Sequence, residues 1–350
     1  MRFSVIVPLF NRPDEIRELL ESLLHQTYTD FEVLVVEDGS ERDARDIVES
    51  FKERLDVHYF RKENTRQGFT RNFGFERAQG EWLVVFDSDC LIPPHYFEAV
   101  EAYLLAHPEV EVYGGPDAAH DSFTDLQKAI SHAMTSPLTT GGIRGGKRNV
   151  GTYHPRSFNM GISRRAWELS GGYRISVKGE DIEFSMRLMA HGLRSDFIEK
   201  AYVYHKRRTD FAQFNRQVRF FGKARVNIRK FFPGSLKPFH WMPTLFLVYV
   251  LCMVPAAAWM RWGLADGADG LTWMSPLLPY VVWHWALFLE AWLKTRSVKV
   301  ALLVPKAARI QLSSYGWGLL TEYIAVVILR RRDSTMGEVR SVPTAVRQTP

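Results

Sequence analysis

The chain is poor in cysteine and lacks two common sequence signals. Of its 350 residues only Cys90 and Cys252 are cysteines, so no disulfide framework is expected and a reducing compartment fits. No Gly-x-Gly-x-x-Gly follows the first apolar run, which argues against a dinucleotide-binding domain. No signal peptide precedes that run either, and we therefore expect the N-terminal domain to stay in the cytosol.

The charge is modest, and its excess lies in the C-terminal half. The formal net charge is +6, and most of the excess comes from one basic stretch. Such a stretch can bind nucleic acid, but apolar segments follow it directly, so a membrane surface is the favoured partner and no nucleic acid is expected. The stretch contains Lys206, Arg207, Arg208, Arg216, Arg219, Lys223, Arg225, Arg229, Lys230 and Lys237.

The first third of the chain alternates apolar runs with amphipathic segments. Buried strands are expected over residues 3–9, 31–36, 57–60 and 82–86, with helices between them. Strands that alternate with helices predict an α/β fold with a mostly parallel, Rossmann-like sheet, flanking helices and right-handed crossovers.

Acidic residues follow two of these strands. The run Trp82 to Phe86 is followed by Asp87-Ser88-Asp89, and the second strand ends in Glu37-Asp38. The carboxyl edge of an open α/β sheet is where ligands bind, and two close carboxylates repel unless a cation neutralises them. A divalent metal that carries a diphosphate is the expected occupant. The alternative is that these acids only end a strand, form a turn or cap the next helix.

Five motifs in a fixed order carry a family resemblance. They are Val5-Ile6-Val7-Pro8-Leu9-Phe10-Asn11-Arg12, Val35-Val36-Glu37-Asp38-Gly39-Ser40, Gly68-Phe69-Thr70-Arg71-Asn72-Phe73-Gly74, Asp87-Ser88-Asp89 and Gly179-Glu180-Asp181. Together they resemble a family 2 glycosyltransferase of the GT-A fold, over residues 3 to 205. The apolar last third resembles the membrane-anchored bacterial members of that family.

The resemblance implies a nucleotide-sugar site and a divalent metal, Mn²⁺ or Mg²⁺. Asp89 is implied as the metal ligand, with Asp87 and His205 as further ligands. Alternatives stay open: Asn11 can cap its helix, Arg71 can be a solvated charge, and His205 can face a phosphate. The residues implied to line the nucleotide-sugar site are Pro8, Phe10, Asn11, Glu37, Asp38, Arg71, Asp87 and Ser88.

The resemblance also implies a catalytic base. Inverting transfer needs a carboxylate that deprotonates the acceptor hydroxyl, and Asp181 is the candidate. Glu180 can take that role or lie on the acceptor side, and either acid can simply favour a helix N-terminus. Asn159 matches the acceptor-side segment, although a turn amide explains it nearly as well.

The C-terminal third predicts membrane segments. Residues 241–260 form an uncharged run of about 20 residues, long enough to cross a bilayer. A second apolar run covers residues 276–293, and a third, residues 310–329, either spans or re-enters the membrane. Basic clusters flank these runs and place their flanks in the cytosol, whereas the alternative is a buried helical subdomain. We therefore expect a catalytic domain at 1–235, a membrane-associated region at 236–332 and a flexible tail at 333–350.

These features predict a multi-pass enzyme of the cytoplasmic membrane whose catalytic domain faces the cytosol. It would transfer a sugar, in a metal-dependent and inverting reaction, from a UDP-sugar to a lipid-linked or membrane-proximal glycan acceptor in polysaccharide assembly. A processive synthase is the alternative, but the Gln-x-x-Arg-Trp of those enzymes is replaced by Gln213-Phe214-Asn215-Arg216-Gln217. A non-catalytic sugar-nucleotide-binding membrane module is a second alternative, and the intact acids count against it.

Overall fold

The computed structural model describes residues 1–140, 153–262, 272–331 and 337–343. The chain folds into two compact units. The sheet unit contains residues 1–120, 144–206 and 334–350, and the helical unit contains residues 121–143 and 207–333. The division after residue 206 differs from the predicted boundary at 235, because the helix that follows packs against other helices of the second unit. Whether residues 1–235 fold alone stays a prediction.

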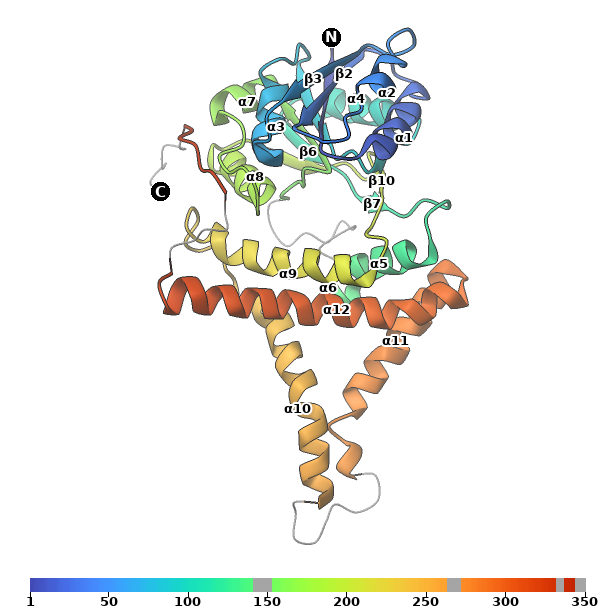
Figure 1. Ribbon diagram of the computed structural model, residues 1–350, viewed down its shortest axis with the longest axis vertical. Helices are drawn as coiled ribbons and strands as arrows, with labels where there is room; N and C mark the ends of the chain where they lie inside the picture. Colours follow the sequence, from blue (N-terminus) through green and yellow to red (C-terminus); the bar gives the residue numbers. More distant parts are fainter. Residues whose placement is uncertain (141–152, 263–271, 332–336, 344–350) are drawn as a thin grey trace. The chain divides into compact units, whose positions relative to one another are not determined.

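The sheet unit is built on a seven-stranded sheet with the order β3-β2-β1-β4-β8-β6-β9 (Figure 1). Neighbours pair in parallel except β8, which runs antiparallel to β4 and β6, so the mostly parallel sheet is confirmed. The strands are β1 (Phe3–Leu9), β2 (Phe31–Asp38), β3 (Val57–Lys62), β4 (Trp82–Phe86), β6 (Val112–Gly114), β8 (Asn159–Ser163) and β9 (Ser195–Phe197).

Helices cover both faces of this sheet because alternate strand residues are apolar on each side. Val5 and Val33 belong to the core under α1, α2 and α4, whereas Ile6 and Leu34 belong to the core under α3, α7 and α8. The helices are α1 (Pro13–Leu24), α2 (Arg45–Glu49), α3 (Arg66–Phe75), α4 (Tyr96–Ala106), α7 (Arg164–Ser170) and α8 (Glu180–Ala190).

A second, three-stranded sheet has the order β5-β10-β7. It joins β5 (Cys90–Leu91), β7 (Asp117–Ala118) and β10 (Val203–His205). Because Cys90 is the partner of His205 in the antiparallel β5–β10 pair, this sheet brings the end of the Asp87-Ser88-Asp89 motif beside a histidine more than one hundred residues later.

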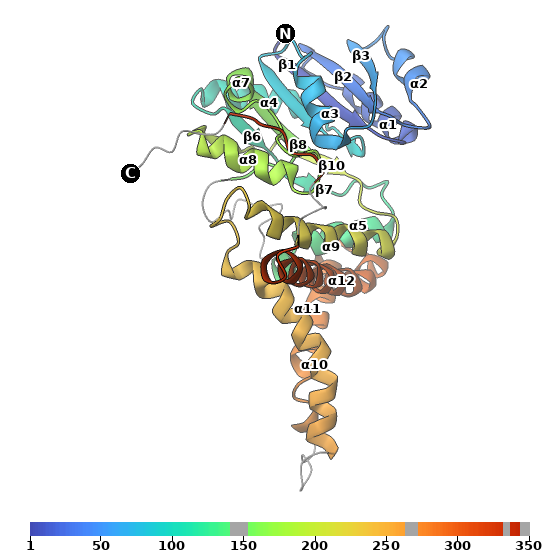
Figure 2. The same cartoon turned by 60° about the vertical axis from the view of Figure 1, so that its left-hand side comes forward.

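The helical unit is organised around one long helix, α12 (Val298–Tyr323). The helix α9 lies along α12, while α10 and α11 extend from α12 (Figures 1 and 2). Apolar residues of α5, α9, α11 and α12 share one core that includes Ile130, Phe214, Leu287 and Val304. The other helices are α5 (Asp125–Thr135), α6 (Pro137–Thr140), α9 (Phe211–Ile228), α10 (Met242–Trp262) and α11 (Leu278–Thr295), with short 3₁₀ turns at Pro238–Trp241 and Thr272–Met274 and a π turn at Ile324–Ile328.

The three predicted membrane spans differ in how far the structure supports them. Among the described residues one helix, Pro238–Trp262, is long and apolar enough to cross a bilayer. The predicted second span lies within α11, which is 18 residues long and carries Glu290 and Lys294. The predicted third span is the second half of α12 and its π turn. Its Gln311 and Glu322 are buried among protein groups, so the apolar run there packs inside a helical bundle. A set of two or three spans is therefore not confirmed.

Part of the predicted flexible tail is packed. Within residues 333–350, the described segment 337–343 returns to the sheet unit and forms a β-bridge between Val339 and Ile175. The remaining tail positions lie outside the described residues.

Candidate functional site

Parallel pairing brings the predicted acids to one edge of the sheet. The strands β1, β2 and β4 run in the same direction and end at Leu9, Asp38 and Phe86. The antiparallel strand β8 begins on that same edge, where Asn159 pairs with Phe86. The site residues thus come from sequence positions far apart, as expected at the carboxyl edge of an open α/β sheet.

Asp38 is held by a lysine that the sequence analysis did not include. The Nζ of Lys62 lies 2.6 Å from Asp38 Oδ1, and the backbone N–H of Thr65 donates to the same oxygen at 2.9 Å. Asp38 is buried, but its second carboxylate oxygen is not engaged by these two contacts. Lys62 is the register partner of Asp38 in the β2–β3 pair, so a known strand register would have identified it.

Arg71 joins Asp87, after strand β4, to Glu180 at the start of α8. Its guanidinium is 2% exposed, with Nη2 at 2.9 Å from Asp87 Oδ1 and Nη1 at 3.2 Å from Glu180 Oε1. Burial, and then the negative charge of Asp181, raise the pKa of Glu180. A buried arginine between two carboxylates fixes the distance between β4 and the start of α8. This arrangement excludes the alternative that Arg71 is a solvated charge.

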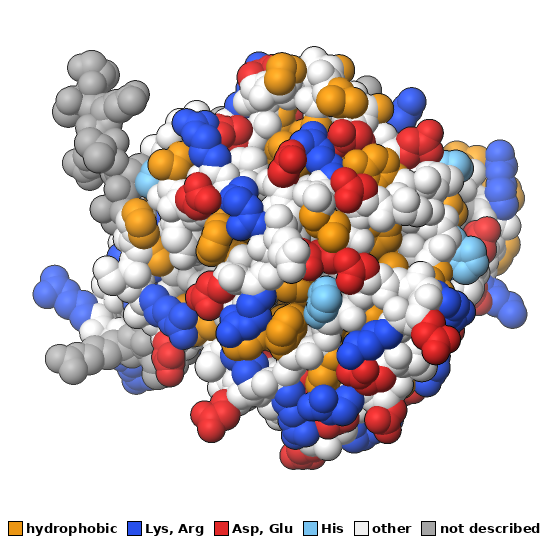
Figure 3. All heavy atoms as spheres, turned by 90° about the horizontal axis from the view of Figure 1, so that it is seen from above, with side chains coloured by type: hydrophobic (Ala, Val, Ile, Leu, Met, Phe, Trp, Pro, Cys, Tyr) orange, Lys and Arg blue, Asp and Glu red, His pale blue; other side chains and the backbone are white. Residues whose placement is uncertain are grey.

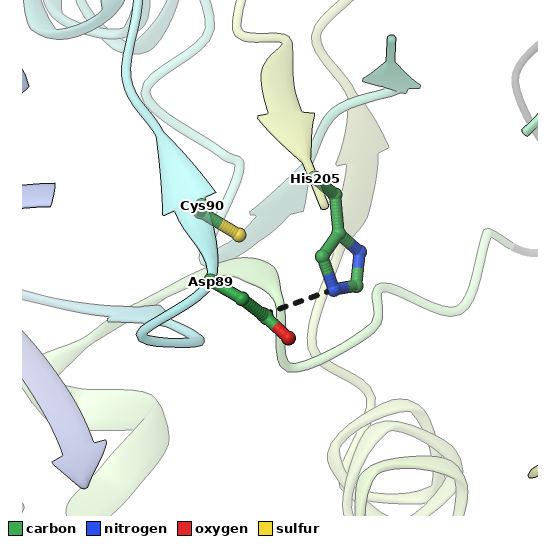
Figure 4. A group of neighbouring side chains, drawn as sticks. All are labelled: Asp89, Cys90 and His205. Atoms are coloured by element: carbon green, nitrogen blue, oxygen red, sulfur yellow. Dashed lines mark ion pairs between the residues drawn. The ribbon is translucent and has the colours of Figure 1, made fainter. Parts of the chain in front are cut away.

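Asp89 lies between two basic side chains. The Nη1 of Arg12 lies 2.5 Å from Asp89 Oδ2, and His205 Nε2 lies 3.2 Å from Oδ1. Figure 4 shows Asp89 and His205 turned toward each other, with the sulfur of Cys90 beside them. Burial alone would raise the pKa of Asp89, but His205 and then Arg12 hold this pKa well below its usual range. Asp89 is therefore ionised at neutral pH and available as a ligand.

These residues fit a divalent cation in part. Among the described residues, ligand atoms of Asp89, Cys90 and His205 lie within 4.8 Å of one another. Burial raises the pKa of the Cys90 thiol, which disfavours the thiolate that would bind a metal. Asp89 and His205 remain as a carboxylate and imidazole set suited to Mn²⁺. Asp87 is not in this group, since Arg71 holds it, so the structure does not place it as a metal ligand.

Asp181 opens the helix α8 next to the buried Glu180. Its Oδ1 accepts from the N–H of Ile182 at 2.8 Å, and its Oδ2 lies 3.5 Å from Arg156 Nη1. Asp181 is half-buried, so its carboxylate can reach a bound molecule, whereas Glu180 is 3% exposed and engaged by Arg71. Of the two acids, Asp181 is therefore the one that a bound molecule can contact.

The remaining residues that were predicted to bind the nucleotide sugar fall into two groups. Phe10 is 47% exposed and Pro8 is half-buried, so both can contact a ligand, while Ser88 is buried. Asn11 neither caps α1 nor points away: its Oδ1 accepts from the N–H groups of Glu41 and Arg42. It braces the loop after β1 against the loop after β2.

Two predicted site residues are structural. Glu37 is fully buried, its carboxylate accepts from Ser40 Oγ and from the N–H of Ala44, and burial raises its pKa. Asn159 is also fully buried: it accepts from Tyr96 Oη at 2.6 Å and donates to the carbonyl of Ala201 at 2.7 Å. Each side chain is buried and hydrogen-bonded within the protein, so the structure offers no support for ligand contact by either, and both stay predictions.

The surface seen from the end that carries the N-terminus mixes charges of both signs (Figure 3). Among the residues coloured there, no broad basic patch of the kind that binds a nucleic-acid backbone is present.

Comparisons with known proteins agree with this geometry. The family model of "Glycosyl transferase family 2" matches residues 4–169. The chain is 27% identical over 233 residues to the uncharacterized glycosyltransferase YibD of Escherichia coli, which covers 62% of this chain and 64% of YibD. It is 36% identical over 111 residues to the poly(ribitol-phosphate) beta-N-acetylglucosaminyltransferase TarS of Staphylococcus aureus, over 31% of this chain and 19% of TarS.

One solved structure shows the same fold. The mannosyltransferase PcManGT of Pyrobaculum calidifontis, solved in complex with GDP-Man and Mn²⁺, superposes with a TM-score of 0.60 at 19% identity, over 88% of this chain and 86% of that chain. The likeness confirms a GT-A-like α/β fold. The matched family model and the named relatives lead to one conclusion: residues 4–169 of the chain match a glycosyl transferase family 2 domain.

Proposed function

We propose that this chain transfers a sugar from a nucleoside diphosphate sugar, with inversion, to a hydroxyl group of a membrane-proximal acceptor. The single observation that carries the proposal is the Arg71 bridge. One buried guanidinium pairs with Asp87 at the donor edge of the sheet and with Glu180 beside Asp181. A donor site and a general base at a fixed spacing are what group transfer in one step requires.

In the proposed reaction Asp181 accepts the proton of the acceptor hydroxyl. The acceptor oxygen then attacks the anomeric carbon from the side opposite the diphosphate. The bond between the anomeric carbon and the diphosphate oxygen breaks, and the nucleoside diphosphate leaves with the electron pair. Arg156, whose Nη1 lies 3.5 Å from Asp181 Oδ2, would help to orient this carboxylate before the acceptor binds.

The donor would be held by groups from three strand ends. The free carboxylate oxygen of Asp38 suits a base N–H or ribose hydroxyl, and Phe10 offers an exposed ring for stacking. Asp89 and His205 would hold a divalent metal, Mn²⁺ or Mg²⁺, which supplies positive charge to the departing diphosphate. Arg12 pairs with Asp89 Oδ2 in this structure and would have to release that oxygen to the metal.

The acceptor is proposed to be lipid-linked or membrane-proximal. Support comes from α10 and α11, where large apolar side chains such as Leu251, Val254, Trp262 and Trp285 are 59–78% exposed. Exposed apolar surface of this extent marks a membrane or protein contact. The basic stretch that begins at Lys206 precedes these helices and suits an anionic cytosolic leaflet. On this support we propose that the enzyme works at the cytoplasmic membrane, in polysaccharide assembly.

We propose the addition of single sugars in preference to processive synthesis. Among the described residues, one helix is able to cross a bilayer, which offers no polymer channel by itself, and the aromatic residue of Gln-x-x-Arg-Trp is missing after Arg216. Product length on one labelled acceptor separates the two activities.

The test is release of nucleoside diphosphate from a panel of UDP-, GDP- and dTDP-sugars by the full chain in detergent. Each donor is assayed with Mn²⁺, with Mg²⁺ and with EDTA, in the presence of bacterial lipid extract as acceptor source. We expect release from one donor, lost in EDTA. No release from any donor, together with no binding of UDP or GDP in a titration, would overturn the proposal.

A further inference from the structure

The described end of the chain, residues 337–343, lies along the loop that leads into the catalytic motif. The N–H of Ser176 donates to the carbonyl of Glu338 at 3.0 Å, and the N–H of Arg340 donates to the carbonyl of Arg174 at 2.8 Å. The N–H of Glu338 donates to Ser176 Oγ at 2.9 Å. These three hydrogen bonds and the Ile175–Val339 bridge add a short strand to an otherwise single-stranded loop.

Side-chain contacts fix the same segment at three more points. The guanidinium of Arg340 lies 4.0 Å from the ring centroid of Phe69, at the start of α3. Gly337 has φ +68°, and a Cβ there would lie 2.2 Å from Ser176 Oγ. A Cβ on Gly171 would lie 2.8 Å from Cδ of Pro343. The segment is therefore closely fitted, and its position is set by specific residues.

The opposite side of the loop contacts the helix that carries Arg71. The N–H of Gly68 donates to the carbonyl of Ser176 at 2.9 Å, and a Cβ on Gly68 would lie 2.2 Å from the carbonyl oxygen of Ile175. The loop then passes through two left-handed residues, Lys178 (φ 69°) and Gly179 (φ 96°), and reaches Glu180. A non-glycine residue at positive φ needs surrounding structure to hold it.

We propose that residues 337–343 are a positioning strap for the loop 173–179, and through it for Glu180 and Asp181. The strap places the base relative to the donor site and touches neither substrate, and this role rests on the proposed function. Because the chain passes through the helical unit between residues 207 and 333 before it returns, the strap makes turnover depend on the end of the full chain. A displacement of about 1 Å at a reacting group can cost about 100-fold in rate.

The first test does not depend on activity. Amide hydrogen exchange of residues 173–181 is compared in the full chain, in Arg340→Ala and in Gly337→Val. Glu338→Ala is the matched control, because that side chain is exposed while its backbone forms the bridge. We expect exchange of this loop to rise at least 10-fold in the first two variants and to stay unchanged in the control. Unchanged exchange in both variants would overturn the strap, whatever the enzyme assay shows.

The second test separates positioning from folding. We expect kcat to fall on the order of 10- to 100-fold in Arg340→Ala while the Kd for UDP stays within about 2-fold. Arg340→Lys, which keeps a cation over the Phe69 ring, should recover part of kcat. A chain shortened after Pro343 should match the full chain, and one shortened after Asp333 should match Arg340→Ala. Equal losses of kcat, UDP binding and thermal stability would contradict positioning, and wild-type kcat in both Arg340→Ala and the chain ending at Asp333 would overturn the proposal.

Discussion

At the scale of single residues, three aspartates at the sheet edge are each paired with a cation. Lys62 pairs with Asp38, Arg71 with Asp87, and Arg12 with Asp89. At Asp89, His205 and then Arg12 hold the pKa of the carboxyl well below its usual range. Under the proposed function, a metal would share the oxygens of this carboxylate.

Replacing Arg12 should tighten metal binding. In Arg12→Gln, Asp89 Oδ2 loses the partner that a metal must displace. We expect the Kd for Mn²⁺, titrated without nucleotide, to fall about 3- to 10-fold, the effect of a partly exposed ion pair of about 1 kcal/mol. Arg17→Gln is the matched control, since Arg17 is exposed on the same helix. Weaker Mn²⁺ binding in Arg12→Gln would show that Arg12 supports the metal and does not compete with it.

The sequence predicts the acids better than their partners. A buried strand that ends in Asp38, or in Asp87-Ser88-Asp89, places those residues at the ligand edge whatever the details of packing. The pairing of Lys62 with Asp38 depends on the β2–β3 register, which no local pattern reveals. The contacts of Arg12 and Arg156 depend on how far a long side chain reaches, and the sequence does not show this either. The burial of Glu37 and Asn159 could not be predicted, because a strand-end position does not say which way a side chain points.

At the scale of elements, α9 and α12 pack closely along a glycine seam. A Cβ on Gly222 would lie 2.2 Å from the carbonyl oxygen of Tyr315, and one on Gly318 would lie 2.1 Å from that of Arg219. The same seam buries Glu322, which accepts from Asn227 Nδ2. An apolar run with a few polar residues suits either a bilayer or a helical neighbour, and for this reason the sequence alone does not decide whether the second half of α12 enters a membrane.

Filling the seam should destabilise the helical unit. In Gly318→Ala the new methyl group meets the α9 backbone, which has no flexible end to move, so we expect a loss of about 1–3 kcal/mol. Gly234→Ala is the control, because nothing lies within 4 Å of the added Cβ. The melting temperatures of the two variants are measured by thermal unfolding in detergent. Equal melting temperatures for Gly318→Ala and Gly234→Ala would show that α9 and α12 do not pack this closely.

At the scale of the whole molecule, the exposed apolar surface of α10 is the feature that would hold the enzyme at a membrane under the proposed function. Leu251, in the middle of α10, is 61% exposed, and Leu105 on α4 is 70% exposed. If α10 enters a bilayer, Leu251→Lys costs about 2.5–3.5 kcal/mol, whereas Leu105→Lys costs nothing there.

Co-sedimentation with vesicles of phosphatidylethanolamine and phosphatidylglycerol checks this difference. We expect the partition coefficient of Leu251→Lys to fall about 100-fold and that of Leu105→Lys to stay at the wild-type value. Equal partitioning of the two variants would contradict the insertion of α10 into the membrane.

The most direct test of the account is the Asp181→Asn variant, assayed beside Glu53→Gln, which alters an exposed acid of the same unit. Sugar transfer and the Kd for the nucleotide product are measured on both. We expect Asp181→Asn to bind the nucleotide with a Kd within about 2-fold of wild type and to transfer sugar about 100- to 10,000-fold more slowly, as loss of a general base does. Glu53→Gln should match wild type in both. Transfer at the wild-type rate by Asp181→Asn would contradict the assignment of the base and with it the proposed mechanism.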